Sequence, residues 1–186
     1  MLRVMCMVLL MAFLSGCSSE DSDINRTMEF RSDLLKAEQC SCDMQITADY
    51  GDKQHTFQLG CVFDSMGDMS FTVLQPQSIA GISGEISQSG GNIRFDDVAL
   101  GFEPLTDQQI SPISAPWILM RCLRSGYLHA CGQEAEYLRI TIDDEYGEND
   151  LRADVWLNAE NIPERADIMY DGRRIAAIRV LNYQIQ

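Results

Sequence analysis

Cysteine thiols are the side chains of this sequence best suited to redox, metal or disulfide chemistry. The chain contains seven cysteines, and five of them lie well beyond the N-terminal segment: Cys40, Cys42, Cys61, Cys122 and Cys131. In a strand, positions two residues apart lie about 6.5–7 Å apart on the same face. A disulfide needs Cα atoms about 5.5–6 Å apart, so Cys40 and Cys42 are poorly placed to bond each other. The C-x-x-C spacing of redox motifs is absent.

The partner of these two thiols depends on how the chain turns back. A turn centred on residues 52–53 places Cys61 opposite Met44. A bulge at Gly60 would instead bring Cys42 and Cys61 directly opposite each other. Three interpretations of this group stay open: a structural disulfide, inert thiols in the core, and a metal or redox site.

A second candidate pair, Cys122 and Cys131, flanks a turn at Gly126. Cys122 lies about 6 Å of helix rise before the turn, and Cys131 lies about 16 Å of strand after it. Simple antiparallel packing therefore misaligns the two thiols. Because the five cysteines are odd in number, at least one thiol is free or pairs with another chain.

The other chemistry-bearing residues do not form a recognisable motif. An acidic run covers residues 143–150, but a calcium loop with Gly147 at its sixth position would need Ile142 as its first ligand. The two histidines, His55 and His129, do not have zinc-ligand spacing. Phosphate-loop and dinucleotide fingerprints are absent. We therefore expect no enzyme activity, no catalytic residue, no metal site and no cofactor.

The N-terminal segment resembles the signal of a bacterial lipoprotein. Arg3 precedes an apolar run at residues 4–14, which is too short to span a membrane and fits a signal peptide. The string Leu14-Ser15-Gly16-Cys17 follows and resembles a lipobox. This resemblance implies that Cys17 becomes the first residue of the mature protein and carries acyl chains such as palmitate. The alternative is an ordinary secretory signal.

These features divide the chain into three parts. We predict a signal peptide at residues 1–16, a flexible tether at 17–26, which is polar and cannot bury a core, and one folded domain at 27–186. Removing residues 1–16 leaves 13 basic and 28 acidic residues, a formal charge of −15. That charge disfavours nucleic acid as a partner. The expected location is the cell membrane or outer membrane, lipid-anchored and facing away from the cytoplasm.

Two helices are predicted among many strands. The first covers residues 28–39, with Thr27 as its N-cap. The second covers residues 115–125, with Ser114 as its N-cap and Gly126 just past its end. Each carries apolar residues at helical spacing.

About ten strands joined mostly by short turns make up the rest, which indicates an antiparallel meander. They cover residues 40–50, 55–64, 69–75, 80–87, 92–103, 127–132, 136–146, 151–159, 167–170 and 173–184. The apolar face shifts within residues 92–103, which indicates a bulge near Asp96-Asp97. The last strand places Tyr183, with Ile175, Ala177 and Leu181, on one face and apolar residues on the other, so it needs two coverings.

This order, a helix, five strands, a helix and five more strands, resembles the LolA/LolB-like group of periplasmic lipoprotein carriers and lipid-anchored relatives. It also resembles the Gram-positive spore and germination lipoproteins of that fold. The matching region is about residues 27–184, and the clearest local similarity lies at residues 69–102. The resemblance implies a mainly β fold with two helices, in which a strongly curved antiparallel sheet forms a half-barrel with helices against its concave face.

Two functions follow from this resemblance. In the first, the half-barrel holds a lipid or other hydrophobic ligand between the sheet and the helix at residues 115–125. In the second, the protein is an accessory or scaffold lipoprotein that binds an envelope or spore-cortex enzyme. An open cavity favours the first function, and a filled concavity with an exposed apolar edge favours the second.

Overall fold

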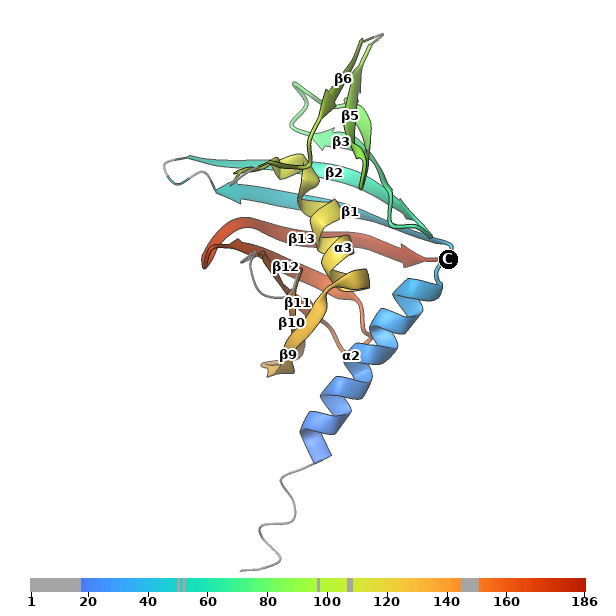
Figure 1. The fold of residues 1–186 in the computed structure, drawn as a ribbon, viewed down its shortest axis with the longest axis vertical. Helices are drawn as coiled ribbons and strands as arrows, with labels where there is room; N and C mark the ends of the chain where they lie inside the picture. Colours follow the sequence, from blue (N-terminus) through green and yellow to red (C-terminus); the bar gives the residue numbers. More distant parts are fainter. Residues whose placement is uncertain (1–17, 50, 52, 97, 107–108, 145–150) are drawn as a thin grey trace, which may run out of the picture.

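The computed structural model describes residues 18–186 apart from 50, 52, 97, 107–108 and 145–150. In these residues the chain forms an eleven-stranded antiparallel sheet, a two-stranded ribbon, two α-helices and one turn of 3-10 helix. The sheet is strongly curved and does not close into a barrel (Figure 1). The predicted class, mainly β with two helices against a curved open sheet, is confirmed.

The first half of the sheet is a meander in which each strand pairs with the next. Its strands are β1 (Gln39–Asp49), β2 (Gln54–Asp64), β3 (Met69–Gln75), β4 (Ser83–Ser87), β5 (Gly90–Phe95) and β6 (Val98–Phe102). The ribbon of β7 (Leu105–Thr106) and β8 (Gln109–Ile110) follows. Buried and more exposed side chains alternate along β1, as expected for a strand with one face in the core.

The second half of the sheet is also a meander. Its strands are β9 (Tyr127–Glu134), β10 (Tyr137–Asp143), β11 (Arg152–Leu157), β12 (Pro163–Tyr170) and β13 (Arg173–Ile185). The last strand, β13, pairs with the first, β1, and this pairing joins the two halves into one sheet. The edges of the sheet are therefore β6 at one end and β9 at the other.

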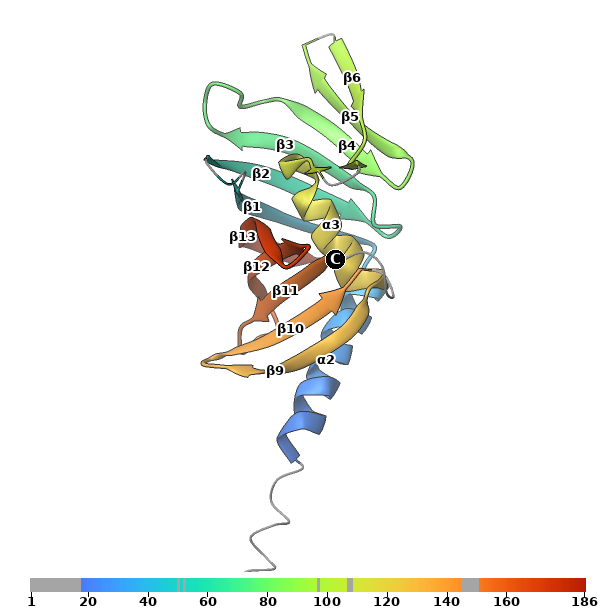
Figure 2. The same ribbon diagram turned by 60° about the vertical axis from the view of Figure 1, so that its left-hand side comes forward.

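Helix α3 (Ala115–Ser125) lies across the concave face of the sheet (Figures 1 and 2). Eight of its eleven residues are buried, which explains why the helix carries few polar side chains. Ser114 occupies the N-cap position, as predicted, but the 3-10 turn η1 (Pro112–Ser114) runs directly into the helix. Ser114 has helical dihedral angles and makes no side-chain cap hydrogen bond.

Helix α2 (Ser18–Lys36) is longer at its N-terminus than predicted. Thr27 is not its cap: the residue lies inside the helix, is fully buried, and donates its hydroxyl to the Asp23 carbonyl oxygen at 2.8 Å. The segment predicted to be a flexible tether is helical from Ser18 onward. Contacts with the rest of the domain hold this helix: Gln133 of β9 donates to the Asp23 carboxylate at 2.8 Å, and Arg26 donates to Asn161, in the connection between β11 and β12, at 2.5 Å.

Several predicted strand boundaries are also wrong. Residues 92–103 form two strands: Phe95 pairs with Val98, and Asp96 adopts a φ of 50°, so the chain reverses there in a tight turn where a bulge was predicted. Strand β4 begins at Ser83, three residues later than predicted, since Gly81 donates its N–H to the Val73 carbonyl at 2.9 Å in a turn.

The register between β1 and β2 changes one pairing that the sequence predicts. Cys42 lies directly opposite Cys61 in continuous pairing between β1 and β2, because the hairpin closes with Asp49 opposite Gln54, and no bulge at Gly60 is needed.

Strand β13 holds one extra residue near each end, where its register shifts against its neighbours. These irregularities turn Ile175 and Tyr183 toward the core, against which both side chains pack. Ile175 and Tyr183 therefore do not share a face with Ala177 and Leu181, contrary to the sequence prediction, because those two residues lie on the outer face.

Candidate functional site

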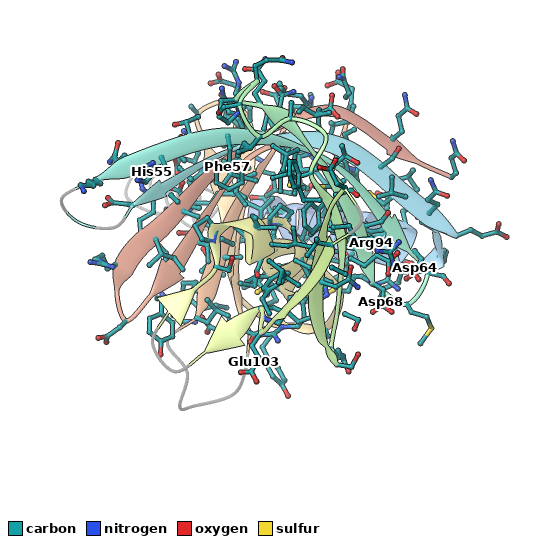
Figure 3. All side chains as sticks on the ribbon, turned by 90° about the horizontal axis from the view of Figure 1, so that it is seen from above. His55, Phe57, Asp64, Asp68, Arg94 and Glu103 are labelled. Carbon is teal, nitrogen blue, oxygen red and sulfur yellow. The ribbon has the colours of Figure 1, made fainter. Side chains whose placement is uncertain are left out.

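The concave side of the sheet is filled by protein where α3 crosses it. Ile118 and Cys122 of the helix are fully buried, as are Ile140 and Val155 on the strands. Viewed from the β6 end, the sheet arches around α3 and side chains occupy the space between them (Figure 3). Three surface depressions, of about 210, 610 and 430 Å³, are lined by described residues, and α3 contributes to none of these three.

Apolar side chains continue along the concave face beyond α3, on the hairpin of β5 and β6. Pairing places Ile93 opposite Leu100, Phe95 opposite Val98 and Gly91 opposite Phe102, so the large side chains share one face. We call this set the apolar strip: Ile93, Phe95, Val98, Leu100 and Phe102. The side chains of Phe95, Val98 and Leu100 are 58%, 59% and 65% exposed. Exposed apolar clusters of this kind are typical of binding surfaces.

The apolar strip lies on an unprotected edge of the sheet. Within the described part of the chain, strand β6 pairs with β5 alone, so its second row of backbone N–H and C=O groups has no strand beside it. Proteins usually block such edges with lysine, proline or a covering element, and β6 contains neither of these two residue types. The opposite edge differs, because α2 packs against β9.

The other face of the hairpin is polar. Arg94, which points away from the strip, forms an ion pair with Glu85 at 3.7 Å. Figure 3 shows Arg94 toward the Asp64 end of β2, with His55 at the opposite end of that strand. The hairpin is therefore apolar on its concave side only, so an apolar partner can cover it from that side alone.

The five predicted disulfide candidates are all free thiols in the structure. Cys40, Cys42, Cys61 and Cys122 are buried, and Cys131 is half-buried. Cys42 and Cys61 are cross-strand neighbours, so the register brings together one candidate pair. The disulfide assignment otherwise stays a prediction.

Burial makes the inward-facing thiols poor nucleophiles. It raises the pKa of the Cys40 thiol to about 11, and it also raises the pKa of Cys42 and Cys61. A thiol is reactive as the thiolate, so these groups are protonated at neutral pH. Within the described residues, no group of three His, Cys, Asp or Glu side chains is arranged to hold a metal ion.

The described part of the acidic run takes part in structural ion pairs. Asp144 forms a bidentate pair with Arg121, one arm of which measures 2.9 Å. Asp143 accepts from Arg152 at 2.7 Å and contacts His129 at 2.9 Å. Burial opposes ionisation of Asp143, yet hydrogen bonds from Arg152 and His129 lower its pKa overall. These carboxylates hold β9, β10 and β11 together, and residues 145–150 lie outside the described residues.

The sequence predicts the residues of the apolar strip to be strand residues but does not show that they lie at an exposed edge. The Asp96-Asp97 pair, interpreted as a bulge, separates two short apolar runs, a pattern that is also typical of a turn between two strands. Cys17, the predicted lipidation site, lies outside the described residues.

No protein-family model matches this chain, and no curated protein matches it. Solved structures do. A LolA superfamily protein from Nitrosomonas europaea is 11% identical, with a TM-score of 0.45 over 91% of this chain and 94% of its own.

Two lipoprotein structures are similar as well. Lipoprotein LppX from Mycobacterium tuberculosis is 9% identical, with a TM-score of 0.40 over 88% of this chain and 92% of its own. A chain in the structure of the Clostridioides difficile CwlD amidase in complex with the GerS lipoprotein is 10% identical, with a TM-score of 0.43. The similarity covers 93% of this chain and 100% of that chain. These similarities concern the fold alone.

Proposed function

We propose that this chain is a lipid-anchored protein outside the cytoplasm that binds a protein partner of the cell envelope through the apolar strip and the β6 edge, and that it catalyses no reaction itself. The observation that carries the proposal is the combination of a filled concave face with an exposed apolar edge. The anchor part of the proposal is supported by the sequence around Cys17.

The chemistry of the β6 edge favours a protein partner over a lipid. An extended segment of another protein can bond to the free backbone N–H and C=O groups of β6 while its apolar side chains cover Val98 and Leu100. An acyl chain can cover the apolar side chains but leaves those backbone groups without partners. A protein strand therefore satisfies both features of the edge.

A hydrophobic ligand is the second candidate, and one observation favours it. The apolar strip lies on the concave face, the same face that a half-barrel carrier uses. A ligand held there would contact Phe95 and Leu100 without entering the space that α3 occupies. Lipid that copurifies with the protein and is lost on Leu100→Asp would support this candidate.

The test uses Leu100→Asp, with Leu35→Asp as the matched control. Both leucines are more than half exposed, at 65% and 52%, but Leu35 lies on α2 away from the strip. Each full-length protein is crosslinked in its native envelope, and the captured proteins are quantified. We expect one stoichiometric partner to be lost with Leu100→Asp and kept with Leu35→Asp.

Hydrogen exchange on the complex gives a second readout. The purified partner should slow the exchange of the β6 backbone amides, since a docked strand bonds to them. Equal capture by both variants, or unchanged exchange along β6, contradicts the proposal.

A further inference from the structure

A row of polar side chains crosses the outer, convex face of the sheet. Strand pairing aligns one residue from each of seven neighbouring strands. In order from β10 to β3, the row consists of Arg139, Trp156, Arg165, Arg179, Gln45, Gln58 and Gln75. The sequence neighbours Ala166, Ile178 and Ile46 are buried in the core, so the row faces outward.

Two arginines meet directly in the middle of this row. Arg165 on β12 is the cross-strand partner of Arg179 on β13. Like charges directly opposite each other on a sheet destabilise it, so this pair needs a compensating contact. Arg165 has one, since its guanidinium lies 4.1 Å from the centre of the Trp156 ring and donates to Glu134 at 3.3 Å.

Arg179 has no such contact. Among the residues that the structure describes, its exposed guanidinium forms neither a hydrogen bond nor an ion pair. Its five N–H donors therefore face solvent beside a second positive charge. Guanidinium groups donate their paired hydrogen bonds best to a planar oxyanion such as a carboxylate.

The arginine pair opens into a depression of about 430 Å³. Three arginines line it, Arg165, Arg174 and Arg179, together with the carboxylates of Glu164 and Asp167. Arg165 is paired with Glu134 and Arg174 with Asp167, each at 3.3 Å, so Arg179 is the lining arginine that has no carboxylate partner among the described residues. This one free guanidinium matches one carboxylate of a ligand.

We propose that this depression binds a glycan that carries one carboxylate per binding unit, held between Arg165 and Arg179. The remaining lining fits the hydroxyl groups of a sugar. Gln45 and Thr47 offer neutral donors and acceptors, and Glu164 accepts hydrogen bonds, as its contact with the Tyr137 hydroxyl at 3.1 Å shows. Gln58 and Gln75 extend the amide row for a longer chain.

The same lining disfavours other anions. A phosphate carries close to two charges at neutral pH, and Glu164 and Asp167 would repel the second. An acidic peptide has several carboxylates that Glu164 and Asp167 would repel, and it lacks hydroxyl groups that could donate hydrogen bonds to these two side chains. A monoanionic, hydroxyl-rich ligand meets neither obstacle. The site lies on the face opposite the apolar strip, so it does not depend on the function proposed above.

The experiment titrates the full-length protein, purified in detergent, with a trisaccharide that carries a single galacturonic acid unit and with a neutral galactose trisaccharide, followed by calorimetry. We expect saturable binding of the acidic trisaccharide alone, weakened at least tenfold by Arg179→Gln. Arg94→Gln is the matched control: Arg94 is exposed on the outer face and pairs with Glu85. It should bind as the parent does. Arg165→Gln should weaken binding too.

Three results would overturn the proposal. The first is no saturable binding of the acidic trisaccharide by a protein whose thermal unfolding is normal. The second is equal binding of the neutral trisaccharide, or binding unchanged by Arg179→Gln. The third is competition by inorganic phosphate or polyglutamate at the same concentration as the trisaccharide, which would assign a different anion to the site. Because Arg179 is exposed and unpaired, its replacement should leave the fold intact.

Discussion

At the scale of single residues, burial controls the chemistry of the thiols. Cys40, Cys42, Cys61 and Cys122 lie in an apolar core that disfavours the charged thiolate, and their pKa values rise as a result. For Cys122 the nearby carboxylate of Asp144 adds to this effect. The sequence pattern Cys-Ser-Cys, which invites a redox interpretation, here belongs to a strand whose cysteines pack inward.

These shifts predict that stability falls in mild alkali. Above pH 9, the ordinary pKa of the thiol, the unfolded chain loses protons that the native protein keeps. For Cys40 this loss continues until about pH 11, its native pKa. Each thiol then lowers the free energy of unfolding by about 1.4 kcal/mol per pH unit. Urea midpoints at pH 8, 9 and 10 should fall in that order, and Cys40→Ala should make the fall less steep. Constant midpoints would contradict this prediction.

At the scale of elements, the position of α3 depends on contacts at its C-terminal end. Arg31 of α2 donates to the carbonyl oxygens of Leu123 and Gly126, at 2.8 and 2.7 Å. These bonds satisfy groups that a helix end leaves free, and they fix the two helices to each other. The sequence predicts a helix over the same residues but gives no sign of its contact with Arg31.

Gly126 joins α3 to β9 where no side chain fits. A Cβ atom there would lie 2.5 Å from Ile142 Cγ2 and 2.7 Å from the Cys122 carbonyl oxygen. Its φ of −70° is ordinary, so the requirement is steric. Gly126→Ala should therefore lower the free energy of unfolding by about 1–3 kcal/mol, measured by urea denaturation.

Gly132→Ala is the matched control, because a Cβ atom there meets nothing within 4 Å. That variant should stay close to the parent in stability. Equal midpoints for the two alanine variants would show that the junction tolerates a side chain.

At the scale of the whole molecule, the open sheet has two edges with different surroundings. Helix α2 packs against the β9 edge, whereas β6 carries exposed apolar side chains and, among the described residues, pairs with a strand on one side only. Within the described residues, no helix is long and apolar enough to cross a membrane. Helix α2 begins at Ser18, next in sequence to the predicted lipidation site, and its 19 residues make it about 28 Å long.

The anchor prediction is tested on the whole chain in its host. Cys17→Ala should leave unprocessed precursor, because the lipid is attached at this cysteine before the signal is removed. Cell fractionation and the mass of the product measure this. Cys6→Ala, within the predicted signal peptide, is the control and should mature as the parent does. A Cys17→Ala protein of mature size in the membrane fraction would refute the lipobox assignment.

Periodicity in the sequence determined the fold class, the range of α3 and the approximate order of the strands. This succeeded because alternation along a strand and spacing along a helix are local properties of neighbouring residues. The resemblance to LolA-like proteins also came from that order. Local pattern could equally place the residues of the apolar strip on a common face, since Ile93 and Leu100 alternate with polar or small neighbours.

Only the tertiary structure decided which apolar residues are covered. Phe95, Val98 and Leu100 are exposed at the edge of the sheet, whereas Ile93 and Phe102 pack partly against the core. The strands with which α3 makes its main contacts are β10, β11 and β12, far from this hairpin in the sheet order. Likewise, Cys42 lies opposite Cys61, and Arg165 opposite Arg179, because register is set by the whole pairing of two strands. Contacts between residues distant in sequence have no local pattern, and for this reason the edge and the arginine pair became visible only in the folded chain, while the thiol pair was one of several pairings that the sequence left open.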